Sequence, residues 1–120
     1  MALHNQHGAQ AEEISRDYLE KNGYMIIQQN YKDRFCEIDI IAKNKEFIIF
    51  VEVKYRARAD FGGAVGAVTP DKLRRMHLSA EFWLSQNQKH KLLQPRLDVV
   101  TVVGDIGDPQ ITHLENIEYT

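Results

Sequence analysis

The sequence predicts an α/β fold in which one mixed sheet is flanked by helices, with the element order αβββαβ. Apolar residues recur at steps of three and four between Gly8 and Gly23 and again after Thr69, as on the buried face of a helix. Between them, residues 24–54 hold short runs rich in Ile, Val and aromatic residues, which are typical of strands. The 120 residues, 43% hydrophobic and 27% charged, predict one globular domain over the whole chain, residues 1–120.

The first predicted helix runs from Gly8 to Gly23, where the glycine supplies the left-handed residue that commonly ends a helix. At 100° per residue, Glu12 falls on the flank of the apolar face and Glu13 points away from it. Glu12 is therefore expected to face the sheet. The apolar face itself comprises Ala11, Ile14, Tyr18 and Leu19.

The elements that follow are three strands in a meander, a second helix and two further strands. Thr69, Pro70 and Asp71 provide an N-cap, a proline at the first helical position and an acid in the first turn. In chain order we predict strands at Tyr24–Asn30, Phe35–Ala42 and Phe47–Lys54, a helix from Pro70 to about Asn87, a strand at Leu97–Val103 and a weak edge strand at Gln110–Leu114.

Charge and cysteine content narrow the functional classes. Fifteen basic and 17 acidic residues leave a net charge of −2, so any polyanion must be bound by a local patch. The segment from Lys54 to Lys91 can provide such a patch, because it contains eight basic residues and only three acidic ones. The longest apolar run, Phe47–Val51, is far too short to span a membrane, and the single Cys36 excludes an internal disulfide. We therefore expect a cytoplasmic protein without a membrane partner.

Two carboxylates and a lysine are expected to meet on neighbouring strands. Because side chains alternate, Glu52 and Lys54 share one face, as do Glu37, Asp39 and Ile41 on the preceding strand. A hairpin that turns through residues 44–47 places Asp39 opposite Glu52, and a shorter connection places it diagonally on the same face. Either register brings the three groups together.

This arrangement suits phosphodiester hydrolysis with a divalent cation. Asp39, Glu52 and the carbonyl of Val53 supply oxygen ligands for Mg²⁺ or Mn²⁺, and Lys54 can hold or help deprotonate the attacking water. Glu12 is expected to be an outer metal ligand or a residue that orients Lys54. Glu37 is expected to support the metal ligands without binding the metal directly. The alternative is a salt bridge from Lys54 to one of the acids at a sheet edge, and for Glu12 a first-turn acid favoured by the helix dipole.

The chain resembles the YraN-like family of small bacterial proteins, which are regarded as nucleases of the restriction-endonuclease-like superfamily with a PD-(D/E)XK active site. The resemblance implies a restriction-endonuclease-like fold, with Asp39, Glu52 and Lys54 as the metal-binding acids and lysine and Glu12 as a first-helix acid. Cys36 departs from the family's usual glycine. The matching residues are Gly8 with Glu12, 19–23, Asn30, 37–39, 50–54 with Arg56, 61–62, Val68 with Lys72, and 98–100.

The expected activity is therefore that of a metal-dependent endonuclease acting on DNA, with branched DNA as a candidate substrate. The alternative is a nucleic-acid-binding or scaffolding protein that keeps the fold without useful turnover, because the same residues would bind metal and phosphate in both. The phosphate contacts are expected to come from Arg56, Arg58, Lys72 and Arg75.

Three further expectations concern residues outside the acids. Leu78 and Phe82 lie one turn apart, away from the main apolar face of the second helix, which predicts a homodimer contact or packing under the following loop. The glycine-rich segment 61–66 is expected to form a flap beside the site. Cys36 is expected to be a small core residue, and the five histidines show no metal-binding pattern.

Overall fold

The computed structural model describes residues 2–58 and 68–118, with side chains from residue 7 onward. The glycine-rich segment 61–66, expected to act as a flap, lies outside the described residues. The elements are α1 (Ala2–Lys21), β1 (Met25–Lys32), β2 (Glu37–Lys43), β3 (Phe47–Arg56), α2 (Pro70–Gln86), the short 3-10 helix η2 (Gln88–His90), β4 (Gln94–Val103) and β5 (Gln110–Leu114).

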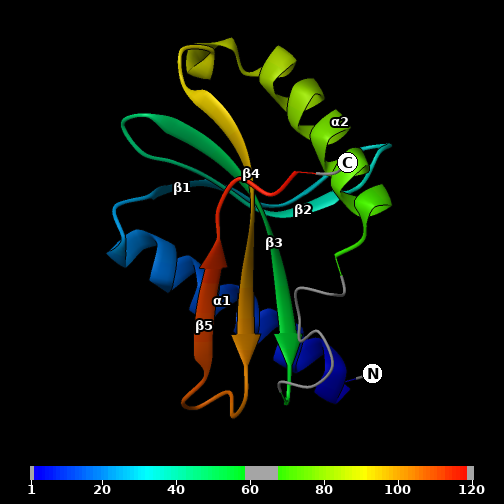
Figure 1. Ribbon diagram of the computed structural model, residues 1–120, viewed down its shortest axis with the longest axis vertical. Helices are drawn as coiled ribbons and strands as arrows, with labels where there is room; N and C mark the ends of the chain where they lie inside the picture. Colours follow the sequence, from blue (N-terminus) through cyan, green and yellow to red (C-terminus); the bar gives the residue numbers. More distant parts are fainter. Residues whose placement is uncertain (1, 59–67, 119–120) are drawn as a thin grey trace.

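The strands form one mixed sheet in the order β1-β2-β3-β4-β5. Neighbours are antiparallel except for β3 and β4, which run parallel because α2 lies in the connection between them. In Figure 1, α1 crosses behind the lower part of β3, β4 and β5, and α2 lies at the upper right, beside the end of β2. This is the expected α/β class with a restriction-endonuclease-like αβββαβ core. Within the described residues, no helix is both long and apolar enough to cross a membrane.

Helix α1 begins at Ala2, earlier than the predicted start at Gly8. Its first residues include no proline, and one glycine is tolerated inside a helix, so the helix extends through the segment that holds His4 and His7. The ring of His7 lies 5.2 Å from that of Tyr55 on β3, so the start of α1 is attached to the sheet. The segment before Gly8, which the sequence did not predict as helical, is therefore part of α1.

The C-terminal end of α1 is closed as the sequence predicts. Gly23 has a φ of 91°, the left-handed conformation that glycine adopts most easily. The Tyr24 amide donates to the Leu19 carbonyl at 3.0 Å, and the Gly23 amide donates to the Glu20 carbonyl at 3.2 Å. These two bonds form a Schellman cap and turn the chain into β1.

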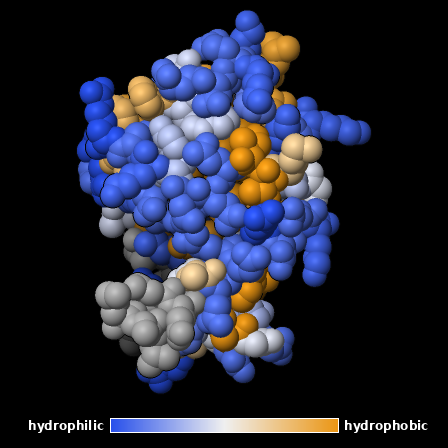
Figure 2. All heavy atoms as spheres, turned by 180° about the vertical axis from the view of Figure 1, so that it is seen from behind, coloured by the Kyte–Doolittle hydropathy of each residue, from blue (hydrophilic) through white to orange (hydrophobic). Residues whose placement is uncertain are grey.

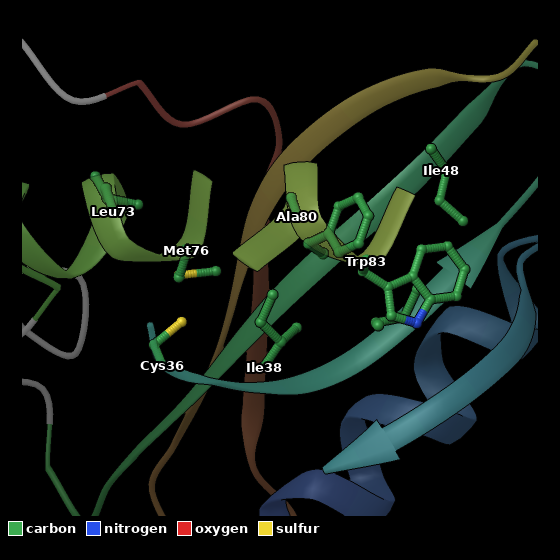
Figure 3. Packing of buried hydrophobic residues seen from close by; sticks show 9 residues of the cluster. Cys36, Ile38, Ile48, Leu73, Met76, Ala80 and Trp83 are labelled. Atoms are coloured by element: carbon green, nitrogen blue, oxygen red, sulfur yellow. The ribbon is translucent and has the colours of Figure 1, made fainter. Parts of the chain in front are cut away.

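Each helix covers one face of the sheet with its own apolar cluster. Figure 3 shows the cluster under α2, where Leu73, Met76 and Trp83 pack against Ile38 and Ile48. Cys36, 9% exposed, belongs to this cluster and is a core residue as expected. Figure 2, which views the molecule from behind Figure 1, shows a mainly hydrophilic surface with small separate apolar areas. The cluster under α1 comprises Ala11, Leu19, Ile40, Ala42, Ile49, Val51, Val100 and Val102.

A buried ionic group joins β4 to the residue before β1 and to the C-terminal segment. The Asp98 carboxylate accepts two hydrogen bonds from Arg96, at 2.9 and 2.8 Å, and one from the Asn116 amide at 3.0 Å. His113 Nε2 lies 2.7 Å from the same carboxylate, and Arg96 also donates to the Tyr24 hydroxyl at 2.6 Å. Because the buried charges are all paired, the group can sit inside the fold.

Candidate active site

The candidate site forms where β2 and β3 stop pairing with each other. The last pair of their ladder is Ile40 with Val51, after which β2 remains paired only with β1 and β3 only with β4. The register of this ladder sets Asp39 opposite Glu52, the first of the two registers that the sequence allows. Asp39 Oδ2 accepts a hydrogen bond of 2.8 Å from the Val53 amide. A side chain of β2 therefore bonds to the backbone of β3 beyond the end of the ladder.

Simple alternation fails along β2 at this point. Ile38 packs in the cluster under α2, whereas Ile40 packs in the cluster under α1, although alternate residues of a regular strand share a face. The prediction that Glu37, Asp39 and Ile41 lie on one face is therefore wrong. The irregularity spans two strands, because residue 30 on β1 lies between the partners of Ile40 and Ile38 and has a φ of 54°.

The carboxyl groups of Asp39 and Glu52 lie close enough for their charges to interact. Burial, the negative charge of Glu52 and, less strongly, that of Glu12 raise the pKa of Asp39 to about 8, against the opposing hydrogen bond from the Val53 amide. Glu52 is only 5% exposed, so water shields the pair poorly. Near neutral pH the Asp39 carboxyl therefore retains a proton at a position that a cation could take instead.

Two lysines from different elements reach the same oxygen of Glu52. Lys54 Nζ lies 3.4 Å from Glu52 Oε2, and Lys72 Nζ lies 3.8 Å from it. Lys72 Nζ is also 3.4 Å from the Glu37 carbonyl oxygen. Sequence reasoning placed Lys54 beside the acids and assigned Lys72 only to phosphate binding. The sequence shows that Lys72 begins a helix, but not where the helix lies over the sheet.

Glu12 lies at the rim of the acidic group. It is half-buried on α1, and its pKa is raised by burial and by the negative charges of Glu37 and Glu52. A hydrogen bond from the side chain of Asn30 partly offsets this rise. Asn30 had no role in the chemistry expected from the sequence. Its signal is an asparagine inside a strand, since asparagine is among the few residues that tolerate a positive φ.

The residues expected to bind phosphate are divided by the structure. Lys72 is drawn into the acidic group, while Arg56 and Arg58 are exposed near the C-terminal end of β3, just beyond Lys54. Arg75 is instead engaged within α2, where its Nε lies 3.0 Å from Asp71 Oδ2. Lys54 and Lys72 are thus the cations in contact with the carboxylates, with Arg56 and Arg58 beyond Lys54, and phosphate binding by Arg75 stays a prediction.

The donor set fits a hard divalent cation better than a zinc ion. Across residues 7–58 and 68–118, no three His, Cys, Asp or Glu side chains are grouped to hold an ion, so a closed protein cage is absent there. Mg²⁺ is commonly held by one or two carboxylates while water and substrate phosphate supply its other ligands. Asp39, Glu52 and the Val53 carbonyl match that pattern, and Glu12 is left in an outer position.

The fold and this group of acids and lysines define a small α/β protein with a restriction-endonuclease-like core. Residues 11–102 match the model of the uncharacterised protein family UPF0102, the YraN family. The chain is 39% identical over 111 residues to a UPF0102 protein of Mycolicibacterium vanbaalenii, covering 92% of this chain and 91% of that one. It is 36% identical over 119 residues to a UPF0102 protein of Bacteroides fragilis, covering 99% and 97%. The chain belongs to the UPF0102 family.

Proposed function

We propose that this protein is a metal-dependent endonuclease that hydrolyses phosphodiester bonds of DNA, with branched DNA as a candidate substrate. The observation that carries the proposal is the placement of Asp39 and Glu52. Two neighbouring carboxyl groups, one of them almost fully buried, lie where β2 and β3 separate, with two lysines on the same Glu52 oxygen. A purely structural ion pair would not need the second acid, which raises the electrostatic cost of burial.

The roles follow from the contacts of each residue. Asp39, Glu52 and the Val53 carbonyl would hold Mg²⁺ or Mn²⁺, which when bound supplies charge neutralisation at the phosphate and activation of the attacking water. Lys54, 3.4 Å from Glu52, is placed to orient that water and to stabilise negative charge as it develops. Glu12, which lies near Glu37 and Glu52, would be an outer ligand of that ion or would orient Lys54, and Arg56 and Arg58 would bind phosphates beyond Lys54.

The direct test is a cleavage assay with Mg²⁺ or Mn²⁺ on single-stranded, duplex, flap and four-way DNA. We expect cleavage by the wild-type protein and a loss of about 100-fold or more in Asp39→Asn and Glu52→Gln, because charge stabilisation of this kind commonly contributes that much. The matched control is Glu46→Gln, which removes an exposed carboxylate in the turn before β3 and should leave cleavage unchanged. Equal activity in all four proteins would contradict the proposal.

Binding without cleavage would favour the other function open to this fold, a nucleic-acid-binding or scaffolding protein. A salt titration of DNA binding in Ca²⁺ measures this directly. If Arg56 and Arg58 contact phosphates, their double substitution by Glu should weaken binding to every DNA form alike and flatten the salt dependence by about one unit per lost contact.

A further inference from the structure

Lys72 connects the second helix to the carboxylates of the candidate site. Thr69 caps α2, and its side-chain oxygen accepts a hydrogen bond of 3.1 Å from the Lys72 amide, so the backbone of this residue is held in the first turn. The side chain reaches across to the sheet, where its ammonium contacts the Glu37 carbonyl oxygen at 3.4 Å and Glu52 Oε2 at 3.8 Å. It remains 21% exposed and can therefore also meet a ligand from solvent.

The contact with Glu52 is one that a bound cation would oppose. A divalent ion on Glu52 would stand close to the ammonium of Lys72, and like charges repel most strongly where water is excluded. Lys54 faces the same repulsion but is fixed on β3 two residues from Glu52, in a strand that pairs with β4 through Arg56. Lys72 is carried by a different element, lies farther from Glu52 at 3.8 Å and also contacts the Glu37 carbonyl oxygen, so its ammonium can leave Glu52 and still be held beside the site.

We propose that Lys72 couples cation binding to phosphate binding, by contacting Glu52 when the site lacks a divalent cation and the DNA phosphate when Glu52 holds one. This inference rests on the proposed function and deepens it. The positive charge of Lys72 becomes available to a phosphate only when a bound cation neutralises Glu52. By thermodynamic reciprocity, DNA must then raise the affinity for the cation by the same factor as the cation raises the affinity for DNA.

The test measures binding and needs no turnover. Filter binding of a radiolabelled four-way junction in EDTA and in Ca²⁺ gives the coupling for the wild-type protein and Lys72→Gln. We expect Ca²⁺ to strengthen wild-type binding about tenfold or more, within the usual range of coupling between sites, and to strengthen binding by the variant far less. Calorimetric titration with Mn²⁺ alone should show tighter binding to Lys72→Gln than to the wild-type protein, because a competing positive charge has been removed.

Two further variants make the result specific. Lys72→Arg keeps the charge and should restore most of the coupling, which confirms that the loss in Lys72→Gln does not come from misfolding. Lys45→Gln removes an exposed lysine in the turn between β2 and β3 and should behave as the wild-type protein.

Each contrary result has a separate meaning. An equal effect of Ca²⁺ on the wild-type protein and Lys72→Gln would overturn the role of Lys72 and leave the proposed nuclease intact. Absence of Mn²⁺ binding to the wild-type protein would overturn the proposed metal site and this inference with it. Mn²⁺ binding without DNA binding in any condition would overturn the inference together with the nucleic-acid substrate.

Discussion

The surroundings of Asp39 influence the ionisation of its carboxyl group in opposite directions. Its hydrogen bond from the Val53 amide favours the ionised carboxylate, whereas burial and the adjacent Glu52 favour the protonated acid. The second influence is stronger, since the pKa of Asp39 rises to about 8. Without a divalent cation, ionising this residue therefore costs stability, and the cation would remove that cost by taking the place of the proton.

The pH dependence of stability follows from this shift. Between the ordinary pKa of 3.8 and about 8, the folded protein retains a proton that the unfolded chain has lost, so the free energy of unfolding falls as pH rises. Asp39→Asn keeps the shape of the side chain without its charge. We expect its free energy of unfolding at pH 8 to be about 1 to 3 kcal/mol higher than that of the wild-type protein. The two should converge near pH 4.

Urea denaturation followed by circular dichroism in EDTA, from pH 4 to pH 9, measures this difference. Asp108→Asn, an exposed acid before β5, is the matched control and should follow the wild-type curve. Parallel curves for Asp39→Asn and the wild-type protein would show that Asp39 does not titrate in this range.

Sequence reasoning reached the residues of the site that depend on regular strand geometry. The hairpin register and alternation along β3 predicted that Asp39, Glu52 and Lys54 lie near one another, whereas alternation along β2 fails between Ile38 and Ile40. Asn30 and Lys72 could not be found in this way. The first depends on a left-handed residue inside a strand, and the second on how α2 is set over the sheet.

At the scale of elements, α2 is joined to the β1–β2 hairpin by one carboxylate. Asp33 Oδ1 accepts hydrogen bonds from the Phe35 amide at 2.8 Å and from the Ser79 hydroxyl at 2.7 Å, and Oδ2 accepts one from the Tyr31 hydroxyl at 2.8 Å. Burial alone would raise the pKa of Asp33, but these hydrogen bonds lower it overall. The hairpin and the helix are thus held together by an ionised group.

Removing the Ser79 hydroxyl should loosen this attachment. Ser79 is fully buried, so Ser79→Ala leaves the carboxylate short of one donor and should lower the free energy of unfolding by about 1 to 3 kcal/mol at pH 7. Ser85→Ala is the control on the same helix, because its hydroxyl donates to the Phe82 carbonyl at the exposed surface. Equal effects of the two substitutions on denaturation midpoints would contradict this assignment.

Element boundaries were predictable where local chemistry sets them. Thr69 and Pro70 define the start of α2, and Gly23 ends the cap of α1. The edge strand β5 has the bounds expected from its apolar pattern. The start of α1 was missed because a glycine marks an end only when the chain takes a positive φ there, and Gly8 lies within the helix.

For the whole molecule, the ionic group around Asp98 joins parts of the chain that are distant in sequence. Burial alone would raise the pKa of Asp98, but hydrogen bonds from His113, Arg96 and the Asn116 amide lower it overall. Asp98→Asn would remove the buried charge partner of Arg96 and leave only the exposed Glu115, 3.8 Å away, so we expect a loss of about 3 to 5 kcal/mol in the free energy of unfolding. Asp105→Asn, an exposed acid, should cost far less.

Thermal or urea unfolding of these two variants at pH 7 measures the difference. In the wild-type protein the contribution of Asp98 is present above the ordinary pKa of 3.8 and is lost as pH falls below it. Asp98→Asn should therefore lack that acid-dependent part. A loss no larger than that of the control would show that the group adds little to stability.

The homodimer expected from the sequence remains a prediction. Phe82 is 43% exposed on α2, and Leu78 one turn earlier is half-buried. If a second copy covers this surface, sedimentation of the wild-type protein should depend on concentration, and Phe82→Glu should remain monomeric because a charge cannot be buried there. Concentration-independent sedimentation of both proteins would remove this surface as a contact.

The sequence contains one tryptophan, and its position gives the protein an internal optical reporter. Trp83 on α2 is 3% exposed, donates a hydrogen bond of 3.0 Å to Gln28 on β1 and stacks on His90 at 5.6 Å. Its emission wavelength therefore reports whether the helix that carries Lys72 is seated on the sheet. A red shift without loss of helical content would reveal α2 lifting away while the rest of the fold persists, a motion visible in an unlabelled sample.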